Sequence, residues 1–576
     1  MVAEHIEDVS NPKNTEVVEK LDKYPTDTSL EAGVEDYISK FLEISDDAKN
    51  NDKKDKVMPL KEGLRTFPKA AIWSVVLSTA LIMEGYDTNL LNSLYAMPAF
   101  KEKYGQPVPN SDDHEIPSNI QITLSMCVNV GEVLGLALAG VVADKLGYRW
   151  TLIVSLFFTT CFIFIVFFAQ NVGMLIAGEL LLGIPWGFFQ TLTISYAAEV
   201  CPLVLRIYLT TYVNACWVIG QLISSGILRA FVGDETALAY RVPFAIQWVW
   251  PIPIALGIFL APESPWWLVR KGKLAQAKKS LSRLISENKY CPDKAYLLEA
   301  MVNKMQLTIT EENIKSQTES SYFDCFKGRD LRRTRVAAIT WLIQNITGSA
   351  LMGYSTYFYV QAGLSTSMSF TFSIIQYVLG LIGTISSWFL SQKMGRFDIY
   401  FMGLCFNCCI LLIVGGLATS SNPNASWGIG SLLLVYTFMY DLTVGPLCYC
   451  IVAELPSAKL RTKTIIIARN VYNISGIITA IITPKMLNPT DWNWGAKTGF
   501  FWAGFCFCSA IWCWFELPET KGRTFAELDL LFHNKIPARK FKKTDVEIFD
   551  AGELIEIMGE EGVKKLVVAN ETKAEV

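Results

Sequence analysis

The sequence predicts an all-α membrane protein with twelve transmembrane helices in two six-helix halves. Of its 576 residues, 51% are apolar and only 18% are charged, whereas soluble proteins carry about 25% charged residues. Apolar runs long enough to cross a hydrocarbon core of roughly 30 Å recur along the chain. These runs form two groups of six, and one long polar stretch separates the groups.

The predicted spans follow from the positions of the apolar runs. The first group lies near 71–97, 118–142, 150–169, 173–198, 208–231 and 242–261. The second group lies near 336–360, 370–391, 398–418, 427–453, 464–484 and 496–517. We therefore expect a tail at 1–68, a first half at 69–261, a linker at 262–335, a second half at 336–517 and a tail at 518–576.

The charges of the short loops predict the orientation. Basic residues concentrate in alternate loops, at Lys145, Arg149, Arg206, Lys393, Arg396, Lys459, Arg461 and Lys463. The positive-inside rule then places both termini and the linker in the cytoplasm. The segment KGKLAQAKKSLSRLI at 271–285 predicts short amphipathic helices, whose simplest role is to connect the two halves.

Composition and motifs exclude several classes of function. A net charge of −3 provides no basic surface for nucleic acid. The chain has three histidines, and its cysteines fall mostly within apolar runs without the spacing of a metal site. No Walker-type glycine loop and no pairing of a nucleophile with a base is present. We therefore expect neither an enzyme nor a cofactor, and no use of ATP.

Short motifs recur at matching places in the two halves. GVVADKLGYRW at 140–150, after the second span, is matched by SQKMGRF at 391–397, after the eighth. AAEVCPLVLR at 197–206, after the fourth, is matched by VAELPSAKLR at 452–461, after the tenth. The same order of acid, proline and arginine indicates a duplicated six-helix unit, as in many transporters.

Together with PESPWWL at 262–268 and PETKGRTFAEL at 518–528, these motifs resemble those of the sugar porters of the major facilitator superfamily. The resemblance covers about 65–530 and implies the major facilitator fold. Within that family, EGYDTNLLNSLYAMPAF at 84–100, GYSTYFYVQAGL at 353–364 and RNVYNISG at 469–476 resemble the fungal α-glucoside permeases, which are proton symporters of the maltose type. The resemblance implies a plasma-membrane protein that handles sugar and protons in the bilayer, with a monomer as the functional unit.

The loop motifs also supply candidate gating charges. Acidic and basic side chains that pair where the halves meet, and part when the halves separate, can set the balance between two states. Alternatively, such charges only cap helix ends and fix topology. The candidates are Asp144, Arg149, Glu199, Arg206, Glu263, Arg396, Glu454, Arg461, Glu519 and Arg523.

Ionisable residues within the apolar runs are the strongest functional signal. A charge at the bilayer centre costs a few kcal/mol even on insertion scales, so these side chains face the bundle interior or a wet cavity. Five carboxyls share this region with one base, and they cannot all remain ionised where water is scarce. These residues are Glu84, Asp87, Glu132, Glu179, Asp441 and Arg469.

Glu84 and Asp87 lie three residues apart and share one helix face. The resemblance implies that an acid in the first helix takes up the proton, and Asp87 matches it, with Glu84 as its neighbour. Related porters place an arginine in the fourth helix where this chain has Glu179. We hypothesise that Arg469 replaces that arginine as counterion of one or more of Glu84, Asp87, Glu132 and Glu179.

A sugar site needs amides and hydroxyls for the sugar hydroxyls, and aromatic rings for the apolar ring faces. The candidates are Gln221, Gln344, Asn345, Tyr354, Tyr357, Tyr449, Asn470 and Asn473. Amides in membrane helices can alternatively serve helix packing alone. Two positions depart from the family pattern: Ala350 replaces an asparagine and Tyr449 replaces a tryptophan, which favours a disaccharide over free glucose.

The sequence thus predicts proton-coupled uptake of an α-glucoside disaccharide by alternating access. A facilitator that moves a hexose or another disaccharide without protons remains an alternative. A transporter-like sugar receptor is an alternative of another class.

Overall fold

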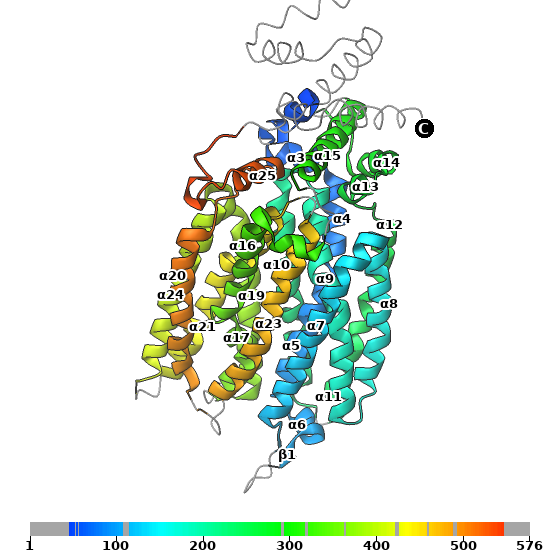
Figure 1. Cartoon of the computed structure of the whole chain (residues 1–576). Coiled ribbons are helices and arrows are strands. Elements are labelled where there is room, and N and C mark those ends of the chain that lie inside the picture. Colours follow the sequence, from blue (N-terminus) through cyan, green and yellow to red (C-terminus); the bar gives the residue numbers. More distant parts are fainter. Residues whose placement is uncertain are drawn as a thin grey trace, which may run out of the picture.

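The structure, a computed structural model, describes residues 45–546 except 52, 56, 108–113, 235, 290–292, 317–320, 362–364, 421–424, 458–459, 488–491 and 493. This part is dominated by long helices (Figure 1). Its one sheet is a two-stranded antiparallel hairpin in which β1 (Gln106–Pro107) pairs with β2 (His114–Glu115). Lys459 lies outside the described residues.

The first half begins with a bent entry helix and ends before the linker. Its elements are α3 (Leu60–Thr66), α4 (Pro68–Ser78), α5 (Ala80–Leu94), α6 (Pro98–Tyr104), α7 (Ser118–Leu146), α8 (Tyr148–Phe167), α9 (Val172–Val200), α10 (Leu203–Phe231), α11 (Leu238–Ile246), η1 (Gln247–Val249) and α12 (Pro251–Leu260). The linker region contains α13 (Pro265–Arg270), α14 (Leu274–Leu284), α15 (Lys294–Ser316) and η2 (Tyr322–Phe326).

The second half follows at once. Its elements are α16 (Gly328–Ile346), α17 (Ser349–Gly353), α18 (Ser355–Gln361), α19 (Thr366–Lys393), α20 (Arg396–Leu417), α21 (Ala425–Leu442), α22 (Val444–Glu454), α23 (Arg461–Leu487), η3 (Gly495–Lys497) and α24 (Thr498–Glu516). The described chain ends with α25 (Phe525–His533) and η4 (Ala538–Lys540).

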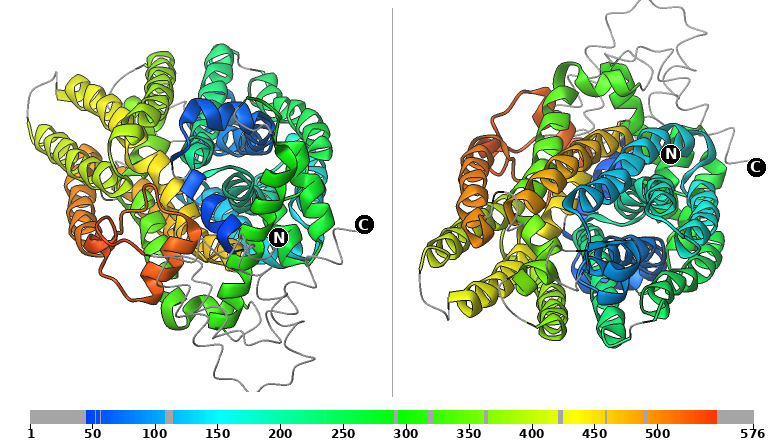
Figure 2. Two further views of the ribbon diagram at one scale, coloured as in Figure 1. Left: turned by 90° about the horizontal axis from the view of Figure 1, so that it is seen from above. Right: turned by 90° about the horizontal axis from the view of Figure 1, so that it is seen from below.

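The helix packing repeats between the halves. In the first half α5 packs on α10 and α7 on α9, and in the second half α16 packs on α23 and α19 on α21. The halves meet where α7 contacts α23 and where α10 contacts α19. Figure 2 shows the helices of the first half, in blue to green, gathered beside those of the second half, in green to orange. The duplicated motifs therefore correspond to a duplicated packing pattern.

The two ends of the bundle differ. Helices α3, α13, α14, α15 and α25 gather at one end, which we call the linker end (Figure 1). Helix α6 and strand β1 lie at the opposite end, which we call the hairpin end. The duplicated loop motifs lie at the linker end, because α7 and α8, α9 and α10, and their counterparts in the second half are joined there.

Ten helical stretches among the described residues are long and apolar enough to cross a membrane, and a bent pair adds an eleventh. Three of the ten join neighbouring elements: Leu238–Leu260 joins α11, η1 and α12, Trp427–Glu454 joins α21 and α22, and Gly495–Glu516 joins η3 and α24. The bent pair joins α3 to Pro68–Leu94 at an angle of 83°. The predicted seventh span near 336–360 is broken into α16, α17 and α18, because the chain adopts a left-handed conformation at Gly348 (φ +98°) and leaves the helix again at Tyr354. Its longest piece, α16, has 19 residues but carries five charged residues near its start, so it is not among the ten.

Glycines bring the helices that carry the buried acids into close contact. A Cβ at Gly220 of α10 would lie 2.2 Å from the carbonyl oxygen of Ile82 in α5. A Cβ at Gly135 of α7 would lie 2.0 Å from the carbonyl oxygen of Ile184 in α9. Real Cβ atoms do not approach so closely, so these contacts require glycine. They hold α5 against α10 and α7 against α9, and thereby position the helices that carry Glu84 and Glu132.

Candidate functional site

A cavity of about 250 Å³ lies between the two halves. Its wall comes from α5, α7 and α10 of the first half and from the region of α16 to α23 in the second. Among the lining residues are Asn89, Asn129, Glu132, Asn214, Trp217, Gln221, Gln344, Asn345, Tyr354, Tyr377, Tyr440, Asp441, Tyr449, Arg469 and Tyr472. Amides, hydroxyls and aromatic rings therefore surround a space that both halves share.

Several predicted sugar ligands lie in this wall: Gln221, Gln344, Asn345, Tyr354 and Tyr449. Gln344 Nε2 donates to the carbonyl oxygen of Gly445 at 3.1 Å, and its Oε1 has no hydrogen-bond partner among the described residues. Asn345 Nδ2 donates to Ser475 Oγ at 2.9 Å. The Gln344 side chain is therefore held by its donor end, and its acceptor oxygen is buried without a partner among the described residues.

The other predicted sugar ligands, Tyr357, Asn470 and Asn473, lie outside the cavity lining. Tyr357 on α18 is half-buried and packs against the apolar core. Asn473 is fully buried and donates from Nδ2 to Gln190 Oε1 at 3.3 Å. Their roles in sugar binding stay predictions.

The spacing of polar residues along the sequence could have identified further residues that line the cavity. Asn129 and Glu132 lie three apart on α7, and Asn214 and Gln221 lie seven apart on α10, so each pair shares one helix face. Both pairs line the cavity. By contrast, Asn89 is identified by tertiary contact: its Oδ1 accepts a hydrogen bond from Tyr377 of the other half at 2.8 Å.

The buried carboxyls occupy distinct environments. Asp87 is 1% exposed and accepts hydrogen bonds from Gln247 Nε2 at 2.6 Å and from Trp186 Nε1 at 3.2 Å. Glu179 is fully buried, and neither carboxylate oxygen has a hydrogen-bond partner among the described residues. Asp441 lines the cavity and accepts from Asn214 of the other half at 2.9 Å. Burial this deep without a cation disfavours the charged form of a carboxyl.

Arg469 reaches the acids indirectly. Its Nε donates to Gln190 Oε1 at 2.8 Å, while Gln190 Nε2 donates to Glu84 Oε1. The Arg469 guanidinium also lies over the ring of Tyr472, 4.1 Å from its centre. Within the described residues no direct ion pair joins Arg469 to Glu84, Asp87, Glu132 or Glu179. The hypothesis that Arg469 is the counterion of these acids stays a prediction. Gln190, which connects Arg469 to Glu84, was not predicted from the sequence.

Ion pairs join the two halves at the linker end. Glu199 of the first half lies 3.6 Å from Arg461 of the second half and 2.9 Å from Arg270 of α13. Asp144 of α7 lies 2.9 Å from Lys463 of α23. Side chains of the duplicated motifs, together with Arg270 and Lys463, thus pair across the linker end.

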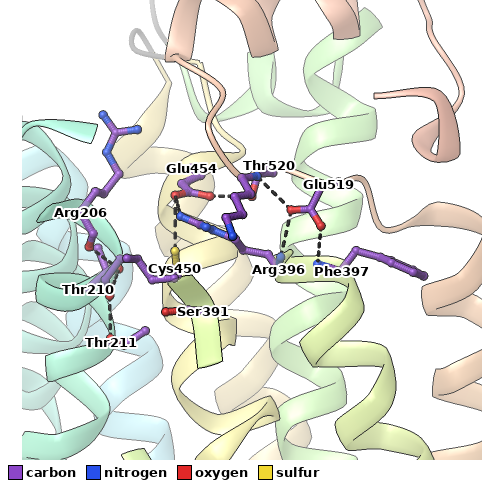
Figure 3. Close-up of polar contacts among 12 residues, drawn as sticks. Arg206, Thr210, Thr211, Ser391, Arg396, Phe397, Cys450, Glu454, Glu519 and Thr520 are labelled. Carbon is purple, nitrogen blue, oxygen red and sulfur yellow. Dashed lines mark hydrogen bonds and ion pairs between the residues drawn. The ribbon is translucent and has the colours of Figure 1, made fainter. Parts of the chain in front are cut away.

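Two of the remaining acidic candidates, Glu263 and Glu519, cap helices. Glu263 accepts hydrogen bonds from the backbone N–H groups of Tyr148 at 3.0 Å and Arg149 at 3.2 Å, at the start of α8. Glu519 does the same for Arg396 at 2.9 Å and Phe397 at 3.3 Å, at the start of α20 (Figure 3). Burial raises the pKa of Glu263, and its backbone hydrogen bonds oppose that shift.

The basic candidates divide between ion pairing and stacking. Arg396 Nη2 lies 3.3 Å from Glu454, which also accepts from Thr520 Oγ1 at 2.5 Å (Figure 3). Arg523 pairs with Glu527 at 2.8 Å. Arg149 donates to the carbonyl oxygen of Phe259. The guanidinium group of Arg206 lies 3.8 Å from the ring centre of Phe525, and that of Arg461 lies 3.7 Å from the same centre.

Comparison with known proteins identifies the family to which the chain belongs. The family model described as "Sugar (and other) transporter" matches residues 73–532. The chain belongs to this sugar transporter family. This sugar transporter is 49% identical to the maltose permease MAL61 of Saccharomyces cerevisiae over 512 residues, which cover 88% of this chain and 83% of that one. It is 47% identical to the general alpha-glucoside permease of the same yeast over 513 residues, 89% of this chain and 83% of that one.

Solved structures show the same fold. The proton:xylose symporter XylE of E. coli, a major facilitator superfamily protein, superimposes with a TM-score of 0.69 at 19% sequence identity. The match covers 81% of this sugar transporter and 100% of that chain. The predicted family and the helical major facilitator fold are confirmed. Since the relatives are permeases, the chain is a transporter and not an enzyme.

Proposed function

We propose that this transporter takes up an α-glucoside disaccharide of the maltose type together with a proton, across the plasma membrane, by alternating access. The observation that carries this proposal is the cavity shared by the two halves. Its wall places amides and aromatic rings, which suit a sugar, beside Glu132 and Arg469, which belong to the buried charge cluster. The maltose and α-glucoside permeases to which the chain is similar favour that substrate class.

The proposal includes a topology of twelve spans with both termini in the cytoplasm. The ten long helices, the bent first span and the broken seventh span, α16 to α18, together supply twelve. Under the positive-inside rule the linker end, which carries Lys145, Arg396 and Arg461, faces the cytoplasm. The linker at 262–335 then connects the halves at 69–261 and 336–517, and the tails at 1–68 and 518–576 are cytoplasmic.

In this arrangement the described state is closed toward the cytoplasm. A proton from outside neutralises an acid of the first helix, Asp87 or its neighbour Glu84, and the sugar binds between the halves. The pairs Glu199–Arg461 and Asp144–Lys463 then separate as the linker end opens. Both ligands leave on the inner side. One chain supplies the whole cavity, which supports a monomeric functional unit in the bilayer.

Purified protein in liposomes tests the proposal. We expect labelled maltose to accumulate above equilibrium when the outside is more acidic than the inside, and a protonophore to abolish the accumulation. Unlabelled disaccharides compete, and glucose competes poorly. Uptake that stops at equilibrium under every pH gradient would identify a facilitator, and the absence of any uptake would favour a receptor.

A further inference from the structure

Gln190 lies between an acid of one half and a base of the other. It is on α9 of the first half and is 2% exposed. Its Nε2 donates to Glu84 Oε1 of α5. Its Oε1 accepts from Arg469 Nε at 2.8 Å and from Asn473 Nδ2 at 3.3 Å, both on α23 of the second half. One amide thus connects α5, α9 and α23.

The two ends of the amide have opposite preferences. The N–H end is stabilised by an ionised Glu84, because a hydrogen bond to a charged acceptor is stronger than one to a neutral acceptor. The C=O end is stabilised by the guanidinium of Arg469 for the same reason. Since the amide is rigid, contact at either end orients the other end. Hydrogen bonds along such a chain also polarise one another, and each bond becomes stronger as a result.

We propose that Gln190 is the positioning residue that couples the protonation of Glu84 to the contact between the two halves. This inference rests on the proposed proton-coupled transport. While Glu84 is ionised, Gln190 is held with its oxygen toward Arg469 and Asn473, so α9 stays tethered to α23. When Glu84 takes up a proton, the amide loses its charged acceptor, and the tether to the second half weakens. The protonated carrier then separates more readily at the linker end.

The location of the tether supports this direction. Helix α9 contacts α23 and α22, and it also carries Glu199, whose ion pair with Arg461 joins the halves at the linker end. Opening of the linker end therefore has to separate Gln190 from Arg469. The reverse also holds: once α23 moves away, Gln190 is free to rotate, and the ionised form of Glu84 loses its oriented donor. Binding of the proton and opening are then linked in both directions, as coupling requires.

Other groups face Glu84 as well, and the test has to separate them from Gln190. They are Asp87 on its own helix, Glu132 on α7, Tyr449 on α22, and Arg469 and Tyr472 on α23. Gln190 also interacts with Glu132. Of these groups, Glu132, Tyr449, Arg469 and Tyr472 line the cavity, so the sugar has a direct route to the same cluster.

The experiment compares Gln190→Met with Gln376→Met in liposomes containing the full chain. Methionine keeps the length of glutamine and removes both hydrogen-bonding ends. Gln376 is a matched control: it is fully buried on α19, accepts from Tyr359 and donates to the Met352 carbonyl, and it is not among the residues that line the cavity. We measure maltose counterflow at equal pH, which needs no net proton movement, and protons moved per maltose.

We expect Gln190→Met to retain counterflow and to move fewer protons per maltose than the wild type, because protonation of Glu84 no longer controls the contact between the halves. Gln376→Met should keep the wild-type ratio. A wild-type ratio in Gln190→Met, or an equal loss in Gln376→Met, would overturn the inference. If Gln190→Met does not reach normal abundance, Gln190→Asn replaces it, because one methylene fewer prevents simultaneous contact with Glu84 and Arg469.

A double variant tests whether Gln190 acts through Glu84. In a Glu84→Gln background the charged acceptor is absent, so adding Gln190→Met should not lower the proton:maltose ratio any further. If the double variant instead loses as much of the proton:maltose ratio as the two single variants lose together, the inference is overturned. A wild-type protein that moves maltose without protons would refute the proposed function instead, and that result is read from the wild-type arm alone.

Discussion

Asp87 and Glu84 are one helical turn apart and have different partners. Asp87 accepts hydrogen bonds from Gln247 and Trp186, which belong to its own half. Glu84 connects through Gln190 to the second half. An acid whose partners all lie in one half can keep its contacts while the halves move, whereas a bridging acid cannot. The two residues therefore suit different tasks: holding a proton and transmitting its presence.

Replacing Asp87 with asparagine removes a titratable group and keeps the size of the side chain. We expect Asp87→Asn to reduce pH-driven accumulation of maltose to simple equilibration, while counterflow continues. The measurement is the inside:outside ratio of labelled maltose at steady state. Asp398→Asn is the control, because Asp398 is 42% exposed and lies 3.8 Å from Lys542 at the linker end. Accumulation by Asp87→Asn at the wild-type ratio would refute the assignment of Asp87.

At the residue scale, the sequence predicts the types of residue that build the site. It predicts less well which individual residues of each type take part. Gln221, Gln344 and Asn345 were predicted and line the cavity. They could be predicted because an amide within an apolar run is costly unless it has a partner. Asn473 has the same chemistry but points toward Gln190. The bridging role of Gln190 depends on the crossing of α5, α9 and α23, and no local pattern encodes that crossing.

The helices of the first half are held together by backbone contact at glycines. At Gly220 of α10 a Cβ would lie 2.2 Å from the carbonyl oxygen of Ile82, on the helix that carries Glu84 and Asp87. At Gly226 of the same helix nothing lies within 4 Å of that position. The contact at Gly220 therefore fixes the distance between α5 and α10, whereas Gly226 makes no such contact.

We expect Gly220→Ala to destabilise the protein by about 1–3 kcal/mol, the usual cost of overpacking a tight contact. Thermal unfolding in detergent measures the loss as a lower midpoint. Gly226→Ala is the matched control on α10, and it should leave the midpoint unchanged or raise it slightly, because alanine favours helix. Equal midpoints for the two variants would contradict the close packing of α5 and α10.

At the element scale, the apolar runs predict most spans within a few residues. The run near 118–142 corresponds to α7 (Ser118–Leu146), and the run near 370–391 to α19 (Thr366–Lys393). The seventh run was predicted as one span, but the structure breaks it at Gly348. A single glycine within an apolar run does not reveal a break; in the structure Tyr436, Leu411 and Trp502 surround Gly348.

The whole molecule is closed at the linker end by contacts between halves. Glu199 is fully buried as a side chain and interacts with Arg461, Arg270 and Tyr148. Removal of one partner from a buried charged set costs far more than loss of an exposed pair. The closure thus depends chiefly on the buried Glu199 cluster, and the partly exposed pair Asp144–Lys463 contributes less.

Arg461→Gln should therefore shift the protein toward opening at the linker end. We expect the population ratio to change by about tenfold or more, which requires only about 1.4 kcal/mol. Cys450, fully buried near Glu454, reports the change through faster reaction with a maleimide, assigned by comparison with Cys450→Ala. Arg335→Gln is the control, because its pair with Glu516 is 50% and 34% exposed. Equal labelling rates in both variants would contradict the closure.

At this scale the sequence motifs predict the two-fold arrangement well. The Pro–Glu segments that follow each half cap α8 and α20 in the same way, through Glu263 and Glu519. Which charges close the gap between halves is harder to predict. Arg270 of the linker joins Glu199, although Arg270 was not among the predicted gating residues.

The central claim is that sugar and proton move together through one cavity. Protons and labelled maltose counted in the same liposomes, without an imposed pH gradient, test it most directly. We expect each addition of maltose to alkalinise the external medium, with a constant ratio of protons to maltose as the maltose gradient is varied. Maltose entry with no accompanying proton entry would contradict it.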